Sequence, residues 1–140
     1  MDTLNLKIIT PKQVVLDESV ISVTIPTFVG EITVLPHHTN LFSLIVEGVI
    51  KIKKKESEDF LAVGGGYLET DGNELHILVS RAYGQDAIDQ SLIETAVQNA
   101  KKILSQSKDQ KERFEATAIL RRSLVDIKLL KRKRRTIGNP

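Results

Sequence analysis

The hydrophobic residues of this chain change their period near residue 84, and this change constrains the fold more than any other feature. Before it, apolar residues alternate with polar ones, as in Leu4, Leu6 and Ile8. A period of two is typical of strands that bury one face. After it, apolar residues recur at intervals of three and four, as in an amphipathic helix. We therefore expect two domains, residues 1–84 and residues 85–140.

Residues 1–84 are predicted to form an antiparallel β-sandwich of about ten short strands, because alternating segments and turn residues follow one another at spacings of about 8–10 residues. Asp71-Gly72-Asn73 predicts a hairpin turn. No segment between strands is long enough for a helix, so we expect no parallel crossover. The run Gly64-Gly65-Gly66 indicates a bulge or a close backbone approach. A phosphate-binding loop is disfavoured there, because no helix follows.

Residues 85–140 are predicted to form two antiparallel helices joined by a short polar link, which makes the whole chain an α+β protein. Asp86 or Asp89 can cap the first helix. The second begins at about Gln110, and its expected apolar face consists of Ala116, Leu120, Leu124, Ile127 and Leu130. Alanine occupies much of the apolar contact between the two predicted helices, and its small side chain buries little area. We therefore expect the hairpin to depend on the sandwich or on a partner.

Charge is divided unequally between the two parts. Residues 1–84 carry 7 Lys and Arg against 11 Asp and Glu, a net charge of −4, and residues 85–140 carry 13 against 7, a net charge of +6. The basic part is where an acidic partner is expected. Six cations gather near the end of the second predicted helix: Lys128, Lys131, Arg132, Lys133, Arg134 and Arg135.

Two interpretations of these cations need no partner protein. Cations are favoured at the negative end of a helix dipole, so the cluster is in part an ordinary solvated helix end. Nucleic-acid binding is a weaker interpretation, because only 4% of residues are aromatic and none lies among the basic residues.

Composition argues against several classes of protein. The chain has no cysteine, so it has no disulfide framework and no thiolate chemistry. No apolar run approaches the roughly 20 residues needed to span a bilayer, and the N-terminus lacks the pattern of a secretory signal. His37-His38 and the distant His76 form a poor set of metal ligands, and a pair on a surface loop is the better interpretation. We predict an intracellular protein without a catalytic site, a metal or a cofactor.

Two segments and the order of the two parts carry a resemblance to a known family. The first segment is Gly30-Glu31-Ile32-Thr33-Val34-Leu35-Pro36-His37-His38-Thr39-Asn40-Leu41, and the second is Gly65-Gly66-Tyr67-Leu68-Glu69. They resemble the Gly-Glu-x-Gly-Val-Leu-Pro-Gly-His-x-Pro-Leu and Gly-Gly-aromatic-x-Glu motifs of epsilon subunits of rotary F-type ATP synthases. His37 and Asn40 replace a glycine and a proline of the first motif.

The resemblance implies a non-catalytic central-stalk subunit that couples rotation of the membrane ring to the catalytic head. Its sandwich would bind the gamma subunit and the ring of c subunits, with Glu31 and His38 as contacts. Its helices would restrain ATP hydrolysis by engaging an acidic loop of the beta subunit through Lys128, Lys131, Arg132 and Arg135. The protein would lie peripherally on the cytoplasmic or stromal face of a cell or thylakoid membrane, held there by the complex, without contacting nucleic acid.

Some members of the family bind ATP at the start of the first helix through an Ile/Leu-Asp-x-x-Arg-Ala motif. The corresponding contacts here would be Asp89 and Arg122, but Leu92 stands where the motif has its arginine. Loss of that cation argues against ATP binding. The alternative to the synthase hypothesis is a free-standing sandwich module whose basic helical tail contacts nucleic acid or anionic lipid.

Overall fold

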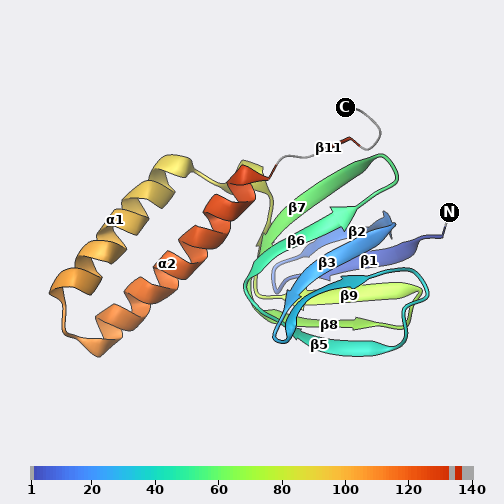
Figure 1. Ribbon diagram of the computed structural model, residues 1–140, viewed down its shortest axis with the longest axis horizontal. Helices are drawn as coiled ribbons and strands as arrows, with labels where there is room; N and C mark the ends of the chain where they lie inside the picture. Colours follow the sequence, from blue (N-terminus) through green and yellow to red (C-terminus); the bar gives the residue numbers. More distant parts are fainter. Residues whose placement is uncertain (1, 133–134, 137–140) are drawn as a thin grey trace.

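The computed structural model describes residues 2–132 and 135–136, and within them a body of strands is followed by two helices (Figure 1). This confirms the predicted α+β fold class. The described strands are β1 (Leu4–Ile9), β2 (Val14–Val20), β3 (Ser22–Thr27), β4 (Gly30–Val34), β5 (Leu41–Ile45), β6 (Gly48–Lys53), β7 (Ser57–Val63), β8 (Gly66–Thr70), β9 (Glu74–Val79), β10 (Ala82–Tyr83) and β11 (Arg135–Thr136).

The strands form two layers that are joined through β3. One layer has the order β10-β7-β6-β3, and the other continues as β5-β8-β9-β1-β2. β3 pairs with β6 over Ser22, Val23 and Thr24, and at Thr27 it pairs with Ile45 of β5. β4 pairs with β3, and β11 pairs with β7.

The core lies between the layers and follows the alternation of the sequence. In β1 the side chains of Leu4, Leu6 and Ile8 are fully buried, while their neighbours are half-buried. Ile50 and Ile77 join them from β6 and β9 of the two layers. Burial of this apolar area stabilises the sandwich, and it leaves the other face of each strand available for contacts.

One pair of strands departs from the antiparallel prediction. β1 and β9 are parallel, with Asn5 opposite Glu74 and Ile9 opposite Leu78. The prediction considered only crossovers between successive strands. Here the connection between the two strands is the rest of the sandwich, β2 to β8, so no crossover helix is needed.

Two of the glycines occupy positions that a larger residue could not fill without strain. Gly72 has φ of +92° in the β8–β9 turn, and a Cβ there would lie 2.7 Å from the carbonyl oxygen of His38. At Gly66 a Cβ would lie 1.9 Å from the carbonyl oxygen of Leu78. The hairpin turn and the close approach that the sequence predicted are therefore both confirmed.

The helical part comprises η1 (Gln85–Ala87), α1 (Gln90–Gln106) and α2 (Gln110–Lys131). α1 and α2 lie antiparallel and pack along their length (Figure 1). Asp89 is the N-cap of α1, and its carboxylate accepts hydrogen bonds from the backbone of Ser91 and Leu92. None of the described helices is both long and apolar enough to cross a bilayer.

The predicted apolar face of α2 is only partly correct. Ala116 is buried, and Leu120, Ile127 and Leu130 are half-buried, but Leu124 is 64% exposed. Leu129, outside the predicted face, is fully buried.

The hairpin meets the sandwich at the C-terminal end of α2, which contacts β6 and β7 (Figure 1). The hydroxyl of Tyr83 donates a hydrogen bond to Asp126. The side-chain amide of Gln85 donates to the carbonyl oxygens of Leu129, at 2.8 Å, and of Arg132. With the burial of Leu129, these bonds join the sandwich and the hairpin at one place.

Candidate partner-binding surfaces

The outer side of the β5-β8-β9 layer carries exposed apolar side chains. Leu44 is opposite Tyr67, and Tyr67 is opposite Leu78, so the three residues form one cross-strand row. Phe42 and Leu44 are 62% and 54% exposed. The rings of Phe42 and Tyr67 stack with centroids 5.3 Å apart. We call Phe42, Leu44, Tyr67 and Leu78 the sheet face.

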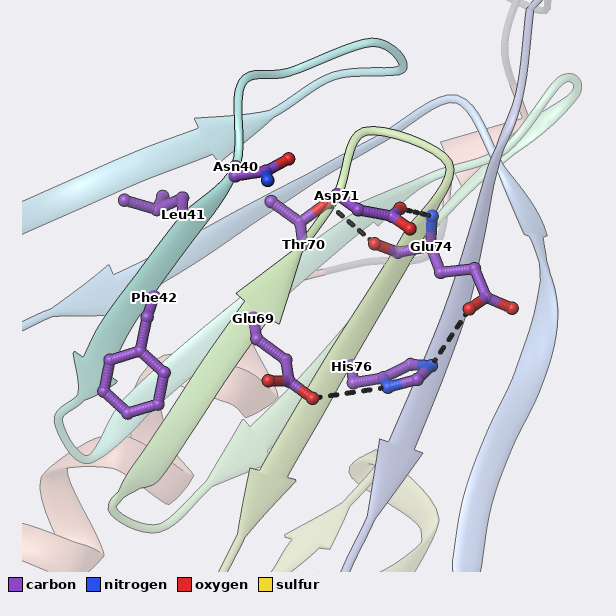
Figure 2. A pocket seen from close by; sticks show the side chains of 8 residues that line it. All are labelled: Asn40, Leu41, Phe42, Glu69, Thr70, Asp71, Glu74 and His76. Carbon is purple, nitrogen blue, oxygen red and sulfur yellow. Dashed lines mark hydrogen bonds and ion pairs between the residues drawn. The ribbon is translucent and has the colours of Figure 1, made fainter.

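A polar row borders the sheet face, and Figure 2 shows it from close by. Glu69 of β8 is opposite Phe42 of β5, and His76 of β9 is opposite Glu69. The imidazole of His76 lies between two carboxylates, 3.7 Å from Glu69 and 3.7 Å from Glu74 (Figure 2). These side chains line an open depression of about 410 Å³ with Phe42. The surface thus combines apolar area with a charged edge, as the interfaces of protein complexes do.

His38 lies in the loop between β4 and β5, at the end of the sandwich where the β8–β9 turn also lies. The amide of His37 donates to the carbonyl oxygen of Gly72 at 2.8 Å. The Nδ1 atom of His38 lies 2.7 Å from the carbonyl oxygen of Thr39. His37 has φ of 67°, in the left-handed region that glycine adopts most easily. Glycine is the residue that the family motif has at this position.

The residues that sequence reasoning considered for ATP meet in one pocket between the helices. Asp89, Leu92 and Arg122 line a cavity of about 420 Å³ with Tyr83 and Asp126, which we call the hairpin pocket. The Asp89 carboxylate already accepts hydrogen bonds from the Ser91 hydroxyl and the Leu92 amide, and these bonds lower its pKa. The Arg122 guanidinium lies 6.0 Å from the centroid of the Tyr83 ring. The apolar Leu92 stands in a pocket that offers a single cation to a phosphate.

Three predicted contact residues come together between the sandwich and the end of α2. Glu31 from β4 and Lys128 and Arg132 from α2 line a polar cleft of about 320 Å³, which we call the basic cleft. Lys131 is exposed and is not among the lining residues. Arg135 is described only through its backbone, which is opposite Glu58 of β7. Lys133 and Arg134 lie outside the described residues.

Sequence reasoning missed the sheet face and the joint between Tyr83, Gln85 and Asp126. The sheet face had a signal, because the segment from Leu41 to Val46 is apolar on both sides of its strand. A strand that is apolar on both sides has its second side covered by something else. The joint had no comparable signal, since Tyr83 and Asp126 are 43 residues apart.

The fold defines a class of protein: a small β-sandwich that presents an apolar face and carries a helical hairpin. Residues 3–85 match the family model described as the β-sandwich domain of the ATP synthase delta/epsilon chain. An ATP synthase epsilon chain of Prochlorococcus marinus (strain NATL1A) is 35% identical over 108 residues, covering 77% of this chain and 80% of that relative. The chloroplastic epsilon chain of Pelargonium hortorum is 31% identical over 129 residues, covering 91% of this chain and 96% of that relative.

Solved structures agree on the fold. A chain from the cryo-EM structure of Euglena gracilis mitochondrial ATP synthase, described as OSCP/F1/c-ring, superposes with a TM-score of 0.81 at 21% identity. The match covers 93% of this chain and 82% of that one. The chain belongs to the delta/epsilon family of ATP synthase subunits, as a non-catalytic, epsilon-type member. The alternative of a free-standing module that binds nucleic acid or lipid is not supported.

Proposed function

We propose that the sheet face binds the gamma subunit of the synthase. The observation that carries this proposal is the apolar row of Leu44, Tyr67 and Leu78 with Phe42 beside it, in which Leu44 and Phe42 are exposed and the other two are half-buried. A contiguous apolar patch on one strand layer is typical of a protein interface rather than of free surface. Glu69 and Glu74 at its border supply charge, and His76 between them supplies hydrogen-bonding groups, that can fix the register of the partner.

The loop that contains His37 and His38 is proposed to meet the ring of c subunits. Glu31, the other predicted contact, lies near the start of β4 and lines the basic cleft, so it is not assigned to this contact. The backbone hydrogen bond from His37 to Gly72 joins this loop to the β8–β9 turn. It restricts movement of the loop relative to the sandwich. A rigid sandwich that holds both gamma and the ring transmits rotation from the ring to the head. The protein would then lie at the cytoplasmic or stromal surface of a cell or thylakoid membrane, held there by the complex.

The helical part, residues 85–140, is proposed to act as a brake on ATP hydrolysis. It is joined to the sandwich mainly at the end of α2, so release of one joint can free the whole hairpin. Lys128, Lys131, Arg132 and Arg135 give its C-terminal end the charge that an acidic loop of the beta subunit requires. Docked and extended states would each have their own contacts, as a population shift demands.

Coupling is tested in vesicles that contain a synthase depleted of its own epsilon subunit. Addition of this chain should restore ATP synthesis driven by a proton gradient. His38→Ala should reduce the restored rate without weakening the binding of gamma, because His38 itself is not part of the sheet face and does not line the depression beside it. Restoration equal to that of the unmodified chain would remove His38 from the proposed ring contacts. Absence of any restoration by the unmodified chain would contradict the coupling role itself.

A further inference from the structure

The floor of the basic cleft is a single row of side chains across four strands. Thr33 of β4 is opposite Thr24 of β3, and Thr24 is opposite Lys51 of β6. Lys51 is in turn opposite Phe60 of β7. All four residues line the cleft. The hydroxyl oxygens of Thr24 and Thr33 lie 3.0 Å apart, so the floor offers two hydroxyl groups beside an ammonium group.

The end of α2 closes the cleft from the other side with two more cations. This end of α2 contacts β6 and β7, and Leu129 on it is fully buried. The Arg132 guanidinium lies 5.5 Å from the centroid of the Phe60 ring, a cation–π contact that holds it at the edge of the cleft. Lys128, one turn earlier, also lines the cleft. Sandwich and hairpin therefore each contribute cations to the same space.

The charges in the cleft are not balanced by the carboxylates around it. Lys51 has an ion-pair partner in Glu58, at 3.6 Å. Within residues 2–132 neither Lys128 nor Arg132 forms an ion pair. Glu31 lines the cleft but lies beyond ion-pair distance of these cations. The free carbonyl groups at the C-terminal end of α2 would repel an anion. Two of them, those of Leu129 and Arg132, accept hydrogen bonds from the Gln85 amide.

We infer that the basic cleft is a binding site for a phosphoryl group, either free or carried by a nucleotide. Two cations without an ion pair among residues 2–132, a third cation and one free hydroxyl donor of the Thr24–Thr33 pair surround about 320 Å³, which is room enough for a phosphate or pyrophosphate and supplies the charged donors that such a group binds. The bound group bridges Thr24 and Lys51 of the sandwich to Lys128 and Arg132 of α2.

This site is separate from the hairpin pocket. Different residues line the two cavities, and the hairpin pocket is formed by α1, α2 and the segment that precedes them. A phosphoryl group in the basic cleft stabilises the docked hairpin, because the cleft exists only while the end of α2 lies against β6 and β7. It also occupies Lys128 and Arg132, two of the proposed contacts to the acidic loop. This regulatory consequence rests on the proposed brake, whereas the binding itself does not.

The test is a titration of the isolated full chain with pyrophosphate, inorganic phosphate and ADP, followed by calorimetry and by backbone amide NMR shifts. Pyrophosphate should shift the signals of Thr24, Lys51 and Lys128. Lys128→Gln and Arg132→Gln should each weaken binding by about tenfold or more, since each removes a charged hydrogen bond. Lys131→Gln is the matched control. It removes the same charge from the same helix end outside the cleft and should weaken binding by less than about twofold.

Thr24→Val tests the sandwich side of the cleft without changing any charge, and it should also weaken binding. Binding of ADP at the strength of pyrophosphate would indicate that the phosphates alone are recognised, and stronger binding of ADP would indicate a nucleotide as the source. Equal losses in the Lys128 and Lys131 variants would overturn the proposal in favour of unspecific attraction. So would shifts confined to Asp89–Ile93, or no binding at all. Each of these results leaves the proposed brake untouched, because the brake is measured on the assembled head.

Discussion

At the residue scale, Gly66 shows how closely the β8 and β9 backbones approach where β8 begins. A Cβ at Gly66 would overlap the carbonyl group of Leu78, whose oxygen would lie 1.9 Å away. The adjacent Gly65 differs, because the nearest atom to its Cβ would be the carbonyl oxygen of Ile45 at 3.5 Å, an ordinary contact. Leu78 is also part of the sheet face, so packing at Gly66 positions a residue of the proposed interface.

Gly66→Ala should destabilise the protein by about 3 kcal/mol, because the backbone of β9 must move to admit the methyl group. Gly65→Ala is the matched control and should change the free energy of unfolding by less than about 1 kcal/mol. Urea unfolding followed by circular dichroism measures both values. Equal stabilities of the two variants would contradict the close approach.

Several single residues could be predicted from the sequence because local backbone chemistry fixes them. The turn at Gly72 is of this kind, and so is the cap of α1, for which the sequence offered Asp86 or Asp89 and the structure has Asp89. His37 shows the limit of such reasoning. A histidine gives no warning of a positive φ, and only the glycine of the family motif indicated that the position is special. The position of His37 beside Gly72 depends on a contact 35 residues away.

At the scale of elements, α2 has two different buried faces, which a single hydrophobic period cannot describe. Ala116 and Ser123 pack on the same side of the helix and are both buried. Leu129 is displaced from Ala116 by roughly 140° around the axis, at about 100° per residue, and is fully buried near the sandwich. The sequence pattern predicted the side toward α1 but not the second contact, because that contact exists only once both parts have folded.

Tyr83 reports on this second contact through its ionisation. Partial burial and the hydrogen bond to the Asp126 carboxylate raise the pKa of Tyr83 above its ordinary value. The protonated phenol is thus favoured in the docked state. Its contribution to docking is fully present below the ordinary pKa of about 10 and is lost as the pH rises through the raised pKa.

A spectroscopic titration can isolate this group, since Tyr67 and Tyr83 are the two tyrosines of the chain. In a Tyr67→Phe background, the phenolate absorbance of Tyr83 should have a midpoint above about 10. Asp126→Asn should lower that midpoint, because the charged acceptor is removed. A midpoint at or below the ordinary value, or one that Asp126→Asn leaves unchanged, would mean that the hairpin is not docked in solution as described.

At the scale of the whole molecule, the basic hairpin is an appendage of an acidic sandwich, joined to it mainly near Leu129. Burial of one leucine side chain, such as Leu129 at this end of α2, stabilises by about 2 kcal/mol at most, and single hydrogen bonds contribute less. A joint of this size can be broken by contacts with a partner. The arrangement therefore suits an element that changes position within the complex.

Deletion of residues 85–140 should raise the rate of ATP hydrolysis by an assembled catalytic head, because the proposed brake is removed. The control is the affinity of the truncated chain for gamma, which should stay unchanged because the sheet face lies within residues 42–78. An unchanged rate of hydrolysis at normal gamma affinity would exclude the regulatory role. A variant with the charges of Lys128 and Arg132 reversed should reproduce part of the increase.

The sequence predicted the architecture well because two hydrophobic periods separate the two parts, and because the motif residues from Gly30 to Glu69 belong to a known family. It did not predict the surfaces. The sheet face and the basic cleft are each built from residues on three or more strands or helices. Their composition depends on strand register, which a single sequence determines only through the finished fold.

The measurement that tests the central claim most directly is the affinity of this chain for the gamma subunit of its own synthase. Leu44→Asp should weaken binding by at least about 100-fold, because it places a charge in the middle of the apolar contact. Leu124→Asp is the control. It makes the same change at a similarly exposed leucine of α2 and should bind as the unmodified chain does. Tight binding by the Leu44 variant, or equal losses in both variants, would contradict the sheet face as the site that holds gamma.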